Sequence, residues 1–209
     1  MKKFRWQILI ILLTGLVVGI LLLSEQPEGV TQIVPEPVTG GFYTEALIGS
    51  LQRLNPLLDF YNPADRDIDR LLYSRLLSFD ERGIPLPDLA ASWGISQDGT
   101  IYNFEIRPDV KWHDGQPLTA ADILFTIEML RNGGEIVPVD LQRFWRDIEV
   151  VQLSDTLIQF KLPEPFAPFL DYLTFGIVPQ HLLGNRTIDQ IRDLQFNIQP
   201  IGSGPYRFD

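Results

Sequence analysis

An uncharged run near the N-terminus, from Trp6 to Leu23, separates the chain into parts that cannot share one core. Of its eighteen residues, only Gln7 and Thr14 are polar. A membrane-spanning helix needs about 17–25 apolar residues, whereas the apolar part of a secretory signal peptide usually has about 7–15. The residues at the end of the run, 21–26 (LLLSEQ), include no clear pair of small residues that a signal peptidase would recognise as a cleavage site. The run therefore favours an uncleaved membrane anchor, with a cleaved signal peptide as the alternative.

The residues on either side of this run predict its orientation and a linker. Lys2, Lys3 and Arg5 make residues 1–5 a basic stub, which stays on the cytoplasmic side of a membrane. Residues 24–41 are rich in proline, glycine and glutamate and lack apolar periodicity, which is typical of a flexible linker. We therefore expect residues 42–209 to fold outside the cytoplasm, in the periplasm or at the cell surface, anchored to the cytoplasmic membrane through Trp6–Leu23.

Charge and cysteine content exclude several classes of function. The chain has 27 acidic and 17 basic residues, a net charge of −10, so we expect no nucleic-acid partner. It has no cysteine, which excludes disulfides, thiolate nucleophiles and cysteine-ligated metals. Its two histidines, His113 and His181, are far apart in sequence. We therefore expect neither enzymatic activity nor a metal or cofactor site.

Residue patterns predict strands and helices in irregular alternation after residue 42. Residues 42–51 are compatible with a buried strand, and residues 67–77 have the apolar stripe of an amphipathic helix. Residues 102–107 and 158–162 alternate apolar and polar side chains, as strands with one buried face do. Thr119 and Asp122 form a variant capping box that begins a helix ending at Gly133. The pattern predicts a mixed α/β fold.

An acidic motif imitates a metal site. Asp65, Asp67 and Asp69 have the spacing of the first ligands of a calcium loop, but Arg70 replaces the turn glycine and Leu76 replaces the final glutamate. We interpret the acids as residues near the N-terminal end of a helix, where the helix dipole favours them.

Two further motifs also have structural interpretations. Adjacent side chains on an extended segment point to opposite faces, so Asp114 is poorly placed to orient His113 for catalysis. Residues 202–205, Gly-Ser-Gly-Pro, are not followed by the Gly-Lys-Ser/Thr of a phosphate-binding loop. The glycines there instead favour a tight crossing of two backbone segments, which we expect between two subdomains.

A co-linear set of motifs runs through the folded part. The motifs are Leu54-Asn55-Pro56, residues 83–93 (GIPLPDLAASW), residues 96–100 (SQDGT), residues 102–107 (YNFEIR), residues 110–122 (VKWHDGQPLTAAD), residues 165–169 (PFAPF) and residues 201–206 (IGSGPY). Their order resembles the family 5 extracytoplasmic solute-binding proteins, the oligopeptide-, dipeptide- and nickel-binding components of ABC importers. The resemblance covers essentially all of residues 42–209.

The resemblance implies the first lobe of a periplasmic-binding-protein-like (type II) fold, in which two lobes close on a ligand by hinge motion. Family members are more than twice as long as this chain, so we expect residues 42–209 to be a truncated N-terminal lobe. One lobe alone leaves half of a ligand in water, and binding would then be weak. The implied function is a substrate-binding subunit that delivers peptides, or another small solute, to ABC permease subunits.

The resemblance also selects candidate ligand contacts. The segment after Asn55-Pro56 lines the cleft in the family, which here selects Phe60, Tyr61 and Asn62. Two aromatic rings followed by an amide suit a peptide bond and its side chains. The alternative is a surface turn beginning at Tyr61, because Asn-Pro favours turns.

Two other functions stay open at this point. The chain could be a membrane-tethered sensor that reports a ligand to a partner protein, or an inactive truncated fragment of a binding protein. A hydrolase would need a nucleophile beside a base, and the sequence shows no such pair.

Overall fold

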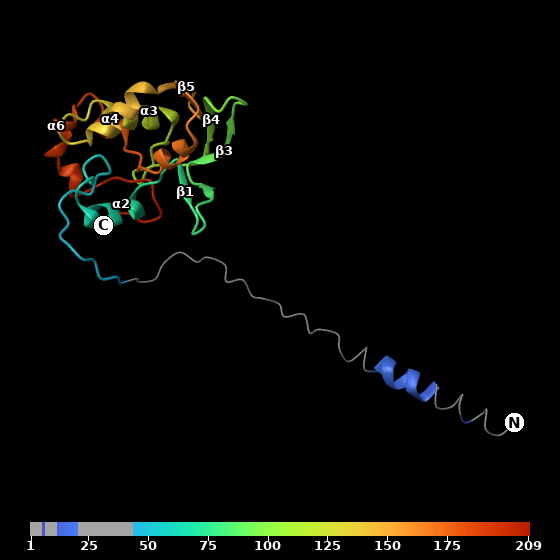
Figure 1. Cartoon of the computed structure of the whole chain (residues 1–209). Coiled ribbons are helices and arrows are strands. Elements are labelled where there is room, and N and C mark those ends of the chain that lie inside the picture. Colours follow the sequence, from blue (N-terminus) through green and yellow to red (C-terminus); the bar gives the residue numbers. More distant parts are fainter. Residues whose placement is uncertain (1–5, 7–11, 21–43) are drawn as a thin grey trace. The chain divides into compact units, whose positions relative to one another are not determined.

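The computed structural model describes residue 6, residues 12–20 and residues 44–209, in two compact units, Met1–Glu45 and Ala46–Asp209 (Figure 1). In the first unit, residues 12–20 are helical. Within the described ranges, no helix is both long enough and apolar enough to span a membrane. The predicted stub 1–5, the predicted linker 24–41 and residues 7–11 and 21–23 of the predicted anchor lie outside the described residues.

A four-stranded antiparallel sheet forms one side of the second unit, in the order β3-β4-β6-β5. Its strands are β3 (Ala90–Ile95), β4 (Ile101–Ile106), β5 (Glu149–Ser154) and β6 (Leu157–Lys161). Alternate residues of β4 and β6 are buried, and Phe104 pairs with Ile158 in the register. Both strands predicted from alternation are confirmed. In the turn before β4, Gly99 has a φ of 70°.

Two helices pack beside this sheet, α3 (Ala120–Arg131) and α4 (Val139–Asp147) (Figure 1). The predicted capping box at the start of α3 is confirmed, since the Asp122 carboxylate accepts the Thr119 backbone N–H at 2.9 Å. The second carboxylate oxygen of Asp122 accepts the Gln180 N–H and so holds the start of α5 (Gln180–Leu183). One aspartate therefore joins two helices.

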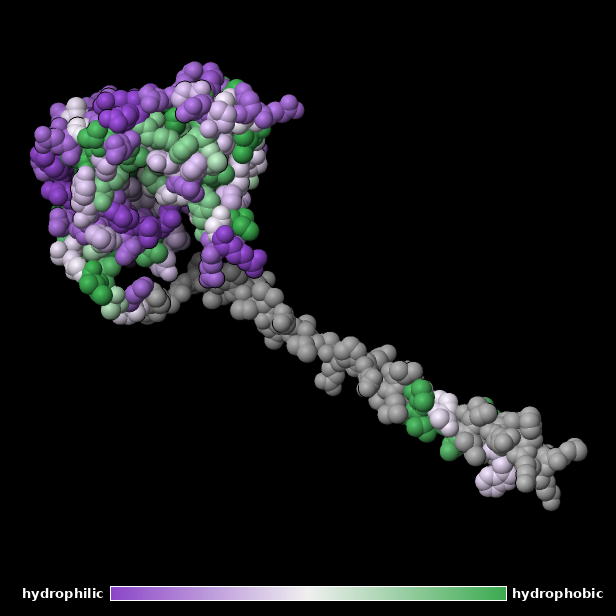
Figure 2. All heavy atoms as spheres, in the orientation of Figure 1, coloured by the Kyte–Doolittle hydropathy of each residue, from purple (hydrophilic) through white to green (hydrophobic). Residues whose placement is uncertain are grey.

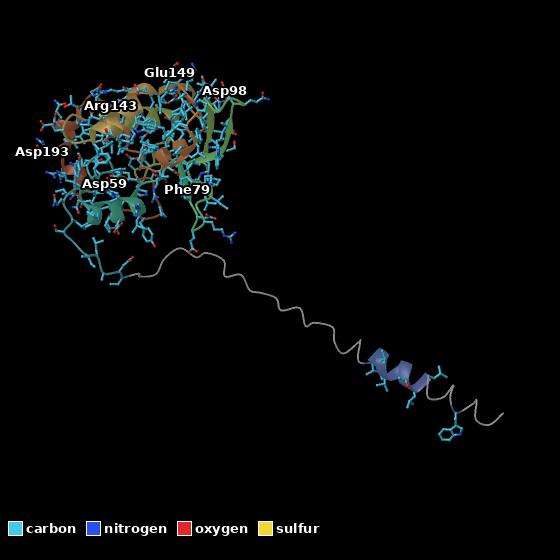
Figure 3. All side chains as sticks on the ribbon, in the orientation of Figure 1. Asp59, Phe79, Asp98, Arg143, Glu149 and Asp193 are labelled. Carbon is cyan, nitrogen blue, oxygen red and sulfur yellow. The ribbon has the colours of Figure 1, made fainter. Side chains whose placement is uncertain are left out.

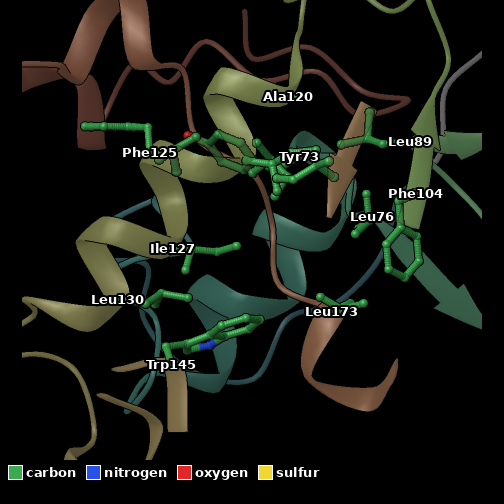
Figure 4. Packing of buried hydrophobic residues seen from close by; sticks show 14 of the residues in the cluster. Tyr73, Leu76, Leu89, Phe104, Ala120, Phe125, Ile127, Leu130, Trp145 and Leu173 are labelled. Atoms are coloured by element: carbon green, nitrogen blue, oxygen red, sulfur yellow. The ribbon is translucent and has the colours of Figure 1, made fainter. Parts of the chain in front are cut away.

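The core fills the space between the sheet and the helices (Figure 4). Trp145 of α4 is fully buried and its ring meets those of Phe160 and Phe169 in edge-on or tilted arrangements. Such aromatic pairs stabilise a core beyond their buried area. The other elements surround this core: α2 (Pro63–Leu72), β1 (Leu77–Phe79), β2 (Pro85–Pro87), η1 (Ala167–Leu173), α6 (Ile188–Arg192) and η2 (Gln195–Asn197). The predicted mixed α/β class is confirmed.

The predicted buried strand over residues 42–51 is wrong for its described part. Residues 44–51 are irregular and exposed, and Ile48 is 97% accessible. No described strand pairs with this segment, so its backbone has no ladder to join. Instead, the Ser50 carbonyl accepts a hydrogen bond from the Asn62 amide, and the Gln52 N–H donates to Asp65.

The predicted helix over residues 67–77 is shifted toward the N-terminus. The structure has α2 over Pro63–Leu72, because the Asn62 side chain caps the helix and Pro63 suits its first position. The helix ends at Leu72, whose carbonyl accepts the Gly204 N–H at 2.8 Å. The Gly204 N–H thus takes the place of the N–H that a longer helix would donate to the Leu72 carbonyl, and the helix ends there.

The glycine-rich segment at residues 202–206 crosses the end of α2 at very short range. A Cβ added at Gly202 would lie 1.9 Å from the Leu72 carbonyl oxygen, and one at Gly204 would lie 2.5 Å from the Leu71 carbonyl oxygen. The Gly202 carbonyl also accepts the His113 N–H. The tight backbone crossing predicted from the glycines is confirmed, but both segments lie within the unit Ala46–Asp209 rather than in two subdomains.

Replacing Gly202 by alanine is therefore expected to destabilise the fold by about 1–3 kcal/mol or more, because the new methyl group overlaps a backbone carbonyl. Urea unfolding followed by tryptophan fluorescence measures the change. The matched control is Gly94→Ala, since a Cβ at Gly94 meets nothing within 4 Å. Equal midpoints for the two variants would contradict the crossing described above.

Candidate functional site

A hollow of about 250 Å³ lies between α2, η1 and the segment that follows η1. Its polar lining comes mainly from α2 and its flanks, and Asp59 is seen beside that helix in Figure 3. Figure 2 shows hydrophilic residues gathered over the α2 region. The apolar lining comes from Phe60, Leu141, Tyr172 and Phe175. The hollow thus combines charged groups with aromatic surface, as binding sites for small ligands do.

Asp69 is the most unusual of the lining residues. It is 3% exposed, and neither carboxyl oxygen accepts a hydrogen bond of ordinary geometry among the described residues. Burial raises the pKa of Asp69 to about 9, and the charges of Asp59 and Asp65 act in the same direction. The nearby backbone N–H of Asn55 has a smaller opposing effect. Asp69 is therefore protonated at neutral pH.

Asp59 is the second buried carboxyl group of the hollow. Burial raises its pKa to about 6, and the positive charge of Arg66 partly offsets this effect. Like-charge repulsion from Asp59 raises the pKa of Asp69, and repulsion from Asp65 raises the pKa of both groups. Two carboxyl groups with raised pKa values in one hollow mark it as a candidate site.

The guanidinium groups around the hollow are engaged elsewhere. Arg66 donates to the backbone carbonyls of Asp59 and Phe60, at 3.2 and 2.6 Å. Arg70 pairs with Asp67 at 3.4 Å, and Arg75 donates to the Arg70 carbonyl at 3.3 Å. These arginines fix the backbone around the start and end of α2 rather than neutralising Asp69.

The aromatic side of the hollow is stiffened by stacking. The rings of Tyr172 and Phe144 are 3.9 Å apart with planes 24° from parallel. Phe175 meets the buried Trp145 edge-on at 5.6 Å. Because each ring is fixed by a neighbour, the wall of the hollow is already formed without a ligand.

The three residues predicted to contact substrate occupy different positions. Phe60 lines the hollow, and Tyr61 is 76% exposed. Asn62 caps α2: its carbonyl accepts the Ala64 N–H, and its amide donates to Ser50 and Asp65. Only Phe60 therefore contributes to the hollow, while the roles of Tyr61 and Asn62 toward a ligand stay predictions.

Sequence reasoning missed Asp69 as a site residue because it treated the three aspartates as one motif. Asp65, Asp69 and Leu72 follow at helical spacing on one face, and all three are buried. The spacing of Asp69, four residues after Asp65 and three before Leu72, was the sequence signal that could have predicted its burial. Asp65 on that face is satisfied by the N–H groups of Gln52 and Arg53, whereas Asp69 is not.

The two histidines have different hydrogen-bond partners in the fold. His181 Nε2 is 2.7 Å from Asp114, and His113 Nε2 is 2.9 Å from the Gly204 carbonyl oxygen. The expected failure of Asp114 to orient His113 is thus confirmed. Over residues 44–209 and the described N-terminal residues, no cluster of three or more His, Cys, Asp or Glu side chains could hold a metal ion.

Comparison with known proteins places this architecture in a family. Residues 85–209 match the model of bacterial extracellular solute-binding proteins, family 5 (middle region). The chain belongs to this family. The family consists of extracytoplasmic binding proteins rather than enzymes.

Relatives of this family 5 chain include binding proteins named for peptides. The oligopeptide-binding protein AppA of Bacillus subtilis is 32% identical over 177 residues, which are 83% of this chain and 32% of AppA. The dipeptide-binding protein of Escherichia coli is 30% identical over 181 residues, 76% of this chain and 33% of that protein. The chain therefore spans about a third of the length of these relatives.

Solved structures agree with the sequence match. AppA of B. subtilis in complex with a nonapeptide has a TM-score of 0.69 at 31% identity over 78% of this family 5 chain and 32% of AppA. NikZ of Campylobacter jejuni in complex with Ni(L-His) has a TM-score of 0.66 at 35% identity, with the same coverage. The predicted resemblance to family 5 binding proteins is confirmed.

Asp69→Asn is expected to make the stability of the protein less dependent on pH. The pKa of Asp69 is about 9 in the folded state against 3.8 for the free side chain, so folding takes up a proton between these values. Stability is therefore complete below pH 3.8 and falls as the pH rises toward 9, by at most about 1.4 kcal/mol per pH unit for one proton. Asparagine cannot ionise and avoids this loss.

Thermal unfolding of both proteins between pH 4 and pH 9 measures the effect. The melting temperature of the variant should exceed that of the wild type increasingly as the pH rises. Asp140→Asn is the control, because the Asp140 side chain is 98% exposed. Parallel curves for wild type and Asp69→Asn would show that Asp69 is not buried as described.

Proposed function

We propose that this chain acts in the extracytoplasmic substrate-binding subunit of an ABC importer and binds peptides or another small solute for transport. The observation that supports this most is the match to AppA over 83% of the chain, together with the family match over residues 85–209. The E. coli relative is likewise named a dipeptide-binding protein. The partners would be ABC permease subunits, and Trp6–Leu23 would hold the subunit at the membrane.

We further propose that residues 46–209 form part of the first lobe of a two-lobed binding protein. Binding of a peptide would then require an opposing lobe that covers the ligand and removes it from water. The hollow beside α2 and the exposed Tyr61 would both belong to the ligand-facing side of this lobe. This view explains why a site with charged and aromatic walls needs no catalytic pair.

Disrupting the gene in the organism that carries it tests the transport role. Uptake of a radiolabelled tripeptide mixture is expected to be lost, and a copy of the gene supplied in trans should restore it. Uptake of a free amino acid serves as the control and should be unchanged. Peptide uptake at the parental rate would contradict the proposal, provided that the disrupted strain makes no protein from this gene.

Substitutions at Tyr61 and Asn62 separate ligand contact from structural support. Asn62→Ala removes a helix cap and is expected to cost about 1 kcal/mol of stability. Tyr61→Ala alters an exposed side chain and should change stability by less than about 0.5 kcal/mol. A loss of peptide affinity in Tyr61→Ala, measured by calorimetry on a protein of unchanged melting temperature, would support direct contact. Unchanged affinity would remove Tyr61 from the site.

A further inference from the structure

The two edge strands of the four-stranded sheet are protected to different degrees. β5 carries Glu149, which pairs with Lys161 at 2.9 Å, and α3 packs beside it. β3 has the sequence AASWGI, without a charged residue or a proline, and lies at the rim of the unit in Figure 1. Native proteins usually protect an edge strand with charges, proline or a covering element, because its free backbone groups can pair with another strand. β3 lacks the first two of these protections.

The register of the sheet shows which backbone groups of β3 face outward. The Ser96 N–H donates to the Ile101 carbonyl of β4 at 2.9 Å. Hydrogen-bonded pairs alternate along an antiparallel ladder, so Gly94 also bonds inward to β4. The N–H and C=O groups of Trp93 and Ile95 therefore point away from β4. Across residues 44–209, the backbone of neither residue bonds to any other element.

The side chains beside these free backbone groups are apolar and partly exposed. Ile95 is 51% exposed, and the half-buried Trp93 ring stacks on Phe104 at 6.2 Å. Cross-strand partners share a face of the sheet, and the partners of Trp93 and Ile95 in β4 are the buried Phe104 and Tyr102. A strand added to β3 would therefore extend the core side of the sheet and cover both exposed side chains.

Only the second half of β3 is free on its outer side. The Ala90 N–H donates to the Leu76 carbonyl at 3.1 Å, and the register shifts between Ala90 and Ser92. At the other end the chain turns, since the Gly99 N–H donates to the Ser96 carbonyl. The available edge is residues 92–96, so an added strand must be equally short.

The same segment of a second copy meets these requirements. In an antiparallel pair centred on Gly94, Trp93 lies opposite Ile95 of the partner subunit, and the outward-facing groups of both residues are hydrogen-bonded. An aromatic ring opposite a β-branched side chain is a favourable cross-strand pair, and without charges in the strand no like charges meet. The two glycines face each other across the axis, where opposite Cα atoms are only about 4.5 Å apart.

We propose that two copies of this chain associate through the outer edge of β3, pairing antiparallel over residues 92–96 with Gly94 on the two-fold axis. The four-stranded sheets of the two copies then form one continuous sheet. Residues 92–96 are far fewer than the roughly 20–30 residues a side of a standard interface, so the association is reversible. It goes beyond the proposed function, because it requires no solute and no permease.

Disulfide trapping of the full chain in detergent tests this register. The chain has no cysteine, so Gly94→Cys introduces a single thiol, and a Cβ at Gly94 meets nothing within 4 Å. Oxidation with copper phenanthroline and air is expected to join two copies, because Cα atoms about 4.5 Å apart suit a disulfide. Denaturing gels without reductant measure the dimer, and melting temperatures verify that each variant is folded.

Ser92→Cys is the matched control, since Ser92 is exposed on the same strand and the same face as Gly94. In the proposed register Ser92 lies opposite Ser96 of the partner subunit, so the two copies of Ser92 are about 13 Å apart at about 3.3 Å per residue. A disulfide cannot span that distance. Gly94→Cys should therefore give at least about tenfold more dimer than Ser92→Cys.

Charges placed on the axis provide a second test. Like charges directly opposite each other destabilise a strand pair, and opposite charges stabilise it. In sedimentation equilibrium, Gly94→Lys and Gly94→Glu should each associate at least about tenfold more weakly than the unmodified chain. An equal mixture of the two variants should recover the association.

Three results would overturn the proposal. Absence of a disulfide dimer in Gly94→Cys would show that β3 does not pair with a second copy. Equal or greater cross-linking of Ser92→Cys would mean random collision or another register. Association that is the same in Gly94→Lys as in the unmodified chain would locate the contact elsewhere, for example in residues 6–23. None of these results bears on peptide uptake, so the proposed transport function is tested separately.

Discussion

The crossing of residues 202–206 over the end of α2 is the contact on which the arrangement of residues 46–209 depends. The carbonyls of Leu71 and Leu72 accept N–H groups from Tyr206 and Gly204, across more than 130 residues of sequence. Ser74 continues the contact by donating to the Ser203 carbonyl. Because carbonyls at the end of a helix need partners, this pairing satisfies α2 and holds its C-terminal end in place. Only glycine leaves room for it.

With α2 held in this position, the helix face that carries Asp65 and Asp69 is turned toward the protein interior. Asp65 and Asp69 are buried on the same side as Leu72. Asp65 is satisfied by backbone N–H groups and by Asn62, whereas Asp69 is left without a partner beside Asp59. A buried polar group without a partner is uncommon in folded proteins, since it weakens the native state. Its retention next to an aromatic hollow is what a binding function would explain.

The family match gives the class of protein, and the hollow gives the residues of one candidate site in it. The comparisons establish the fold and a class of extracytoplasmic binding proteins, several of which are named for peptides. Structures of the same fold are solved with ligands as different as a nonapeptide and Ni(L-His). Within that fold, the buried carboxyl groups of Asp59 and Asp69 and the aromatic rings around them define the chemistry of the hollow.

Local sequence patterns alone were sufficient to predict β4, β6 and the capped start of α3, because alternation and capping depend on near neighbours in sequence. The ends of α2 and the exposure of residues 44–51 could not be predicted in this way. Those features depend on whether a distant segment competes for backbone hydrogen bonds, as Gly204 does and as no described strand does for residues 44–51. The same holds for the site: the sequence contains Phe60 and the three aspartates, but only the tertiary structure decides which carboxylate finds donors. Burial and partner geometry are properties of the packed chain, so Asp65 finds hydrogen-bond donors while Asp69, four residues along the same helix, does not.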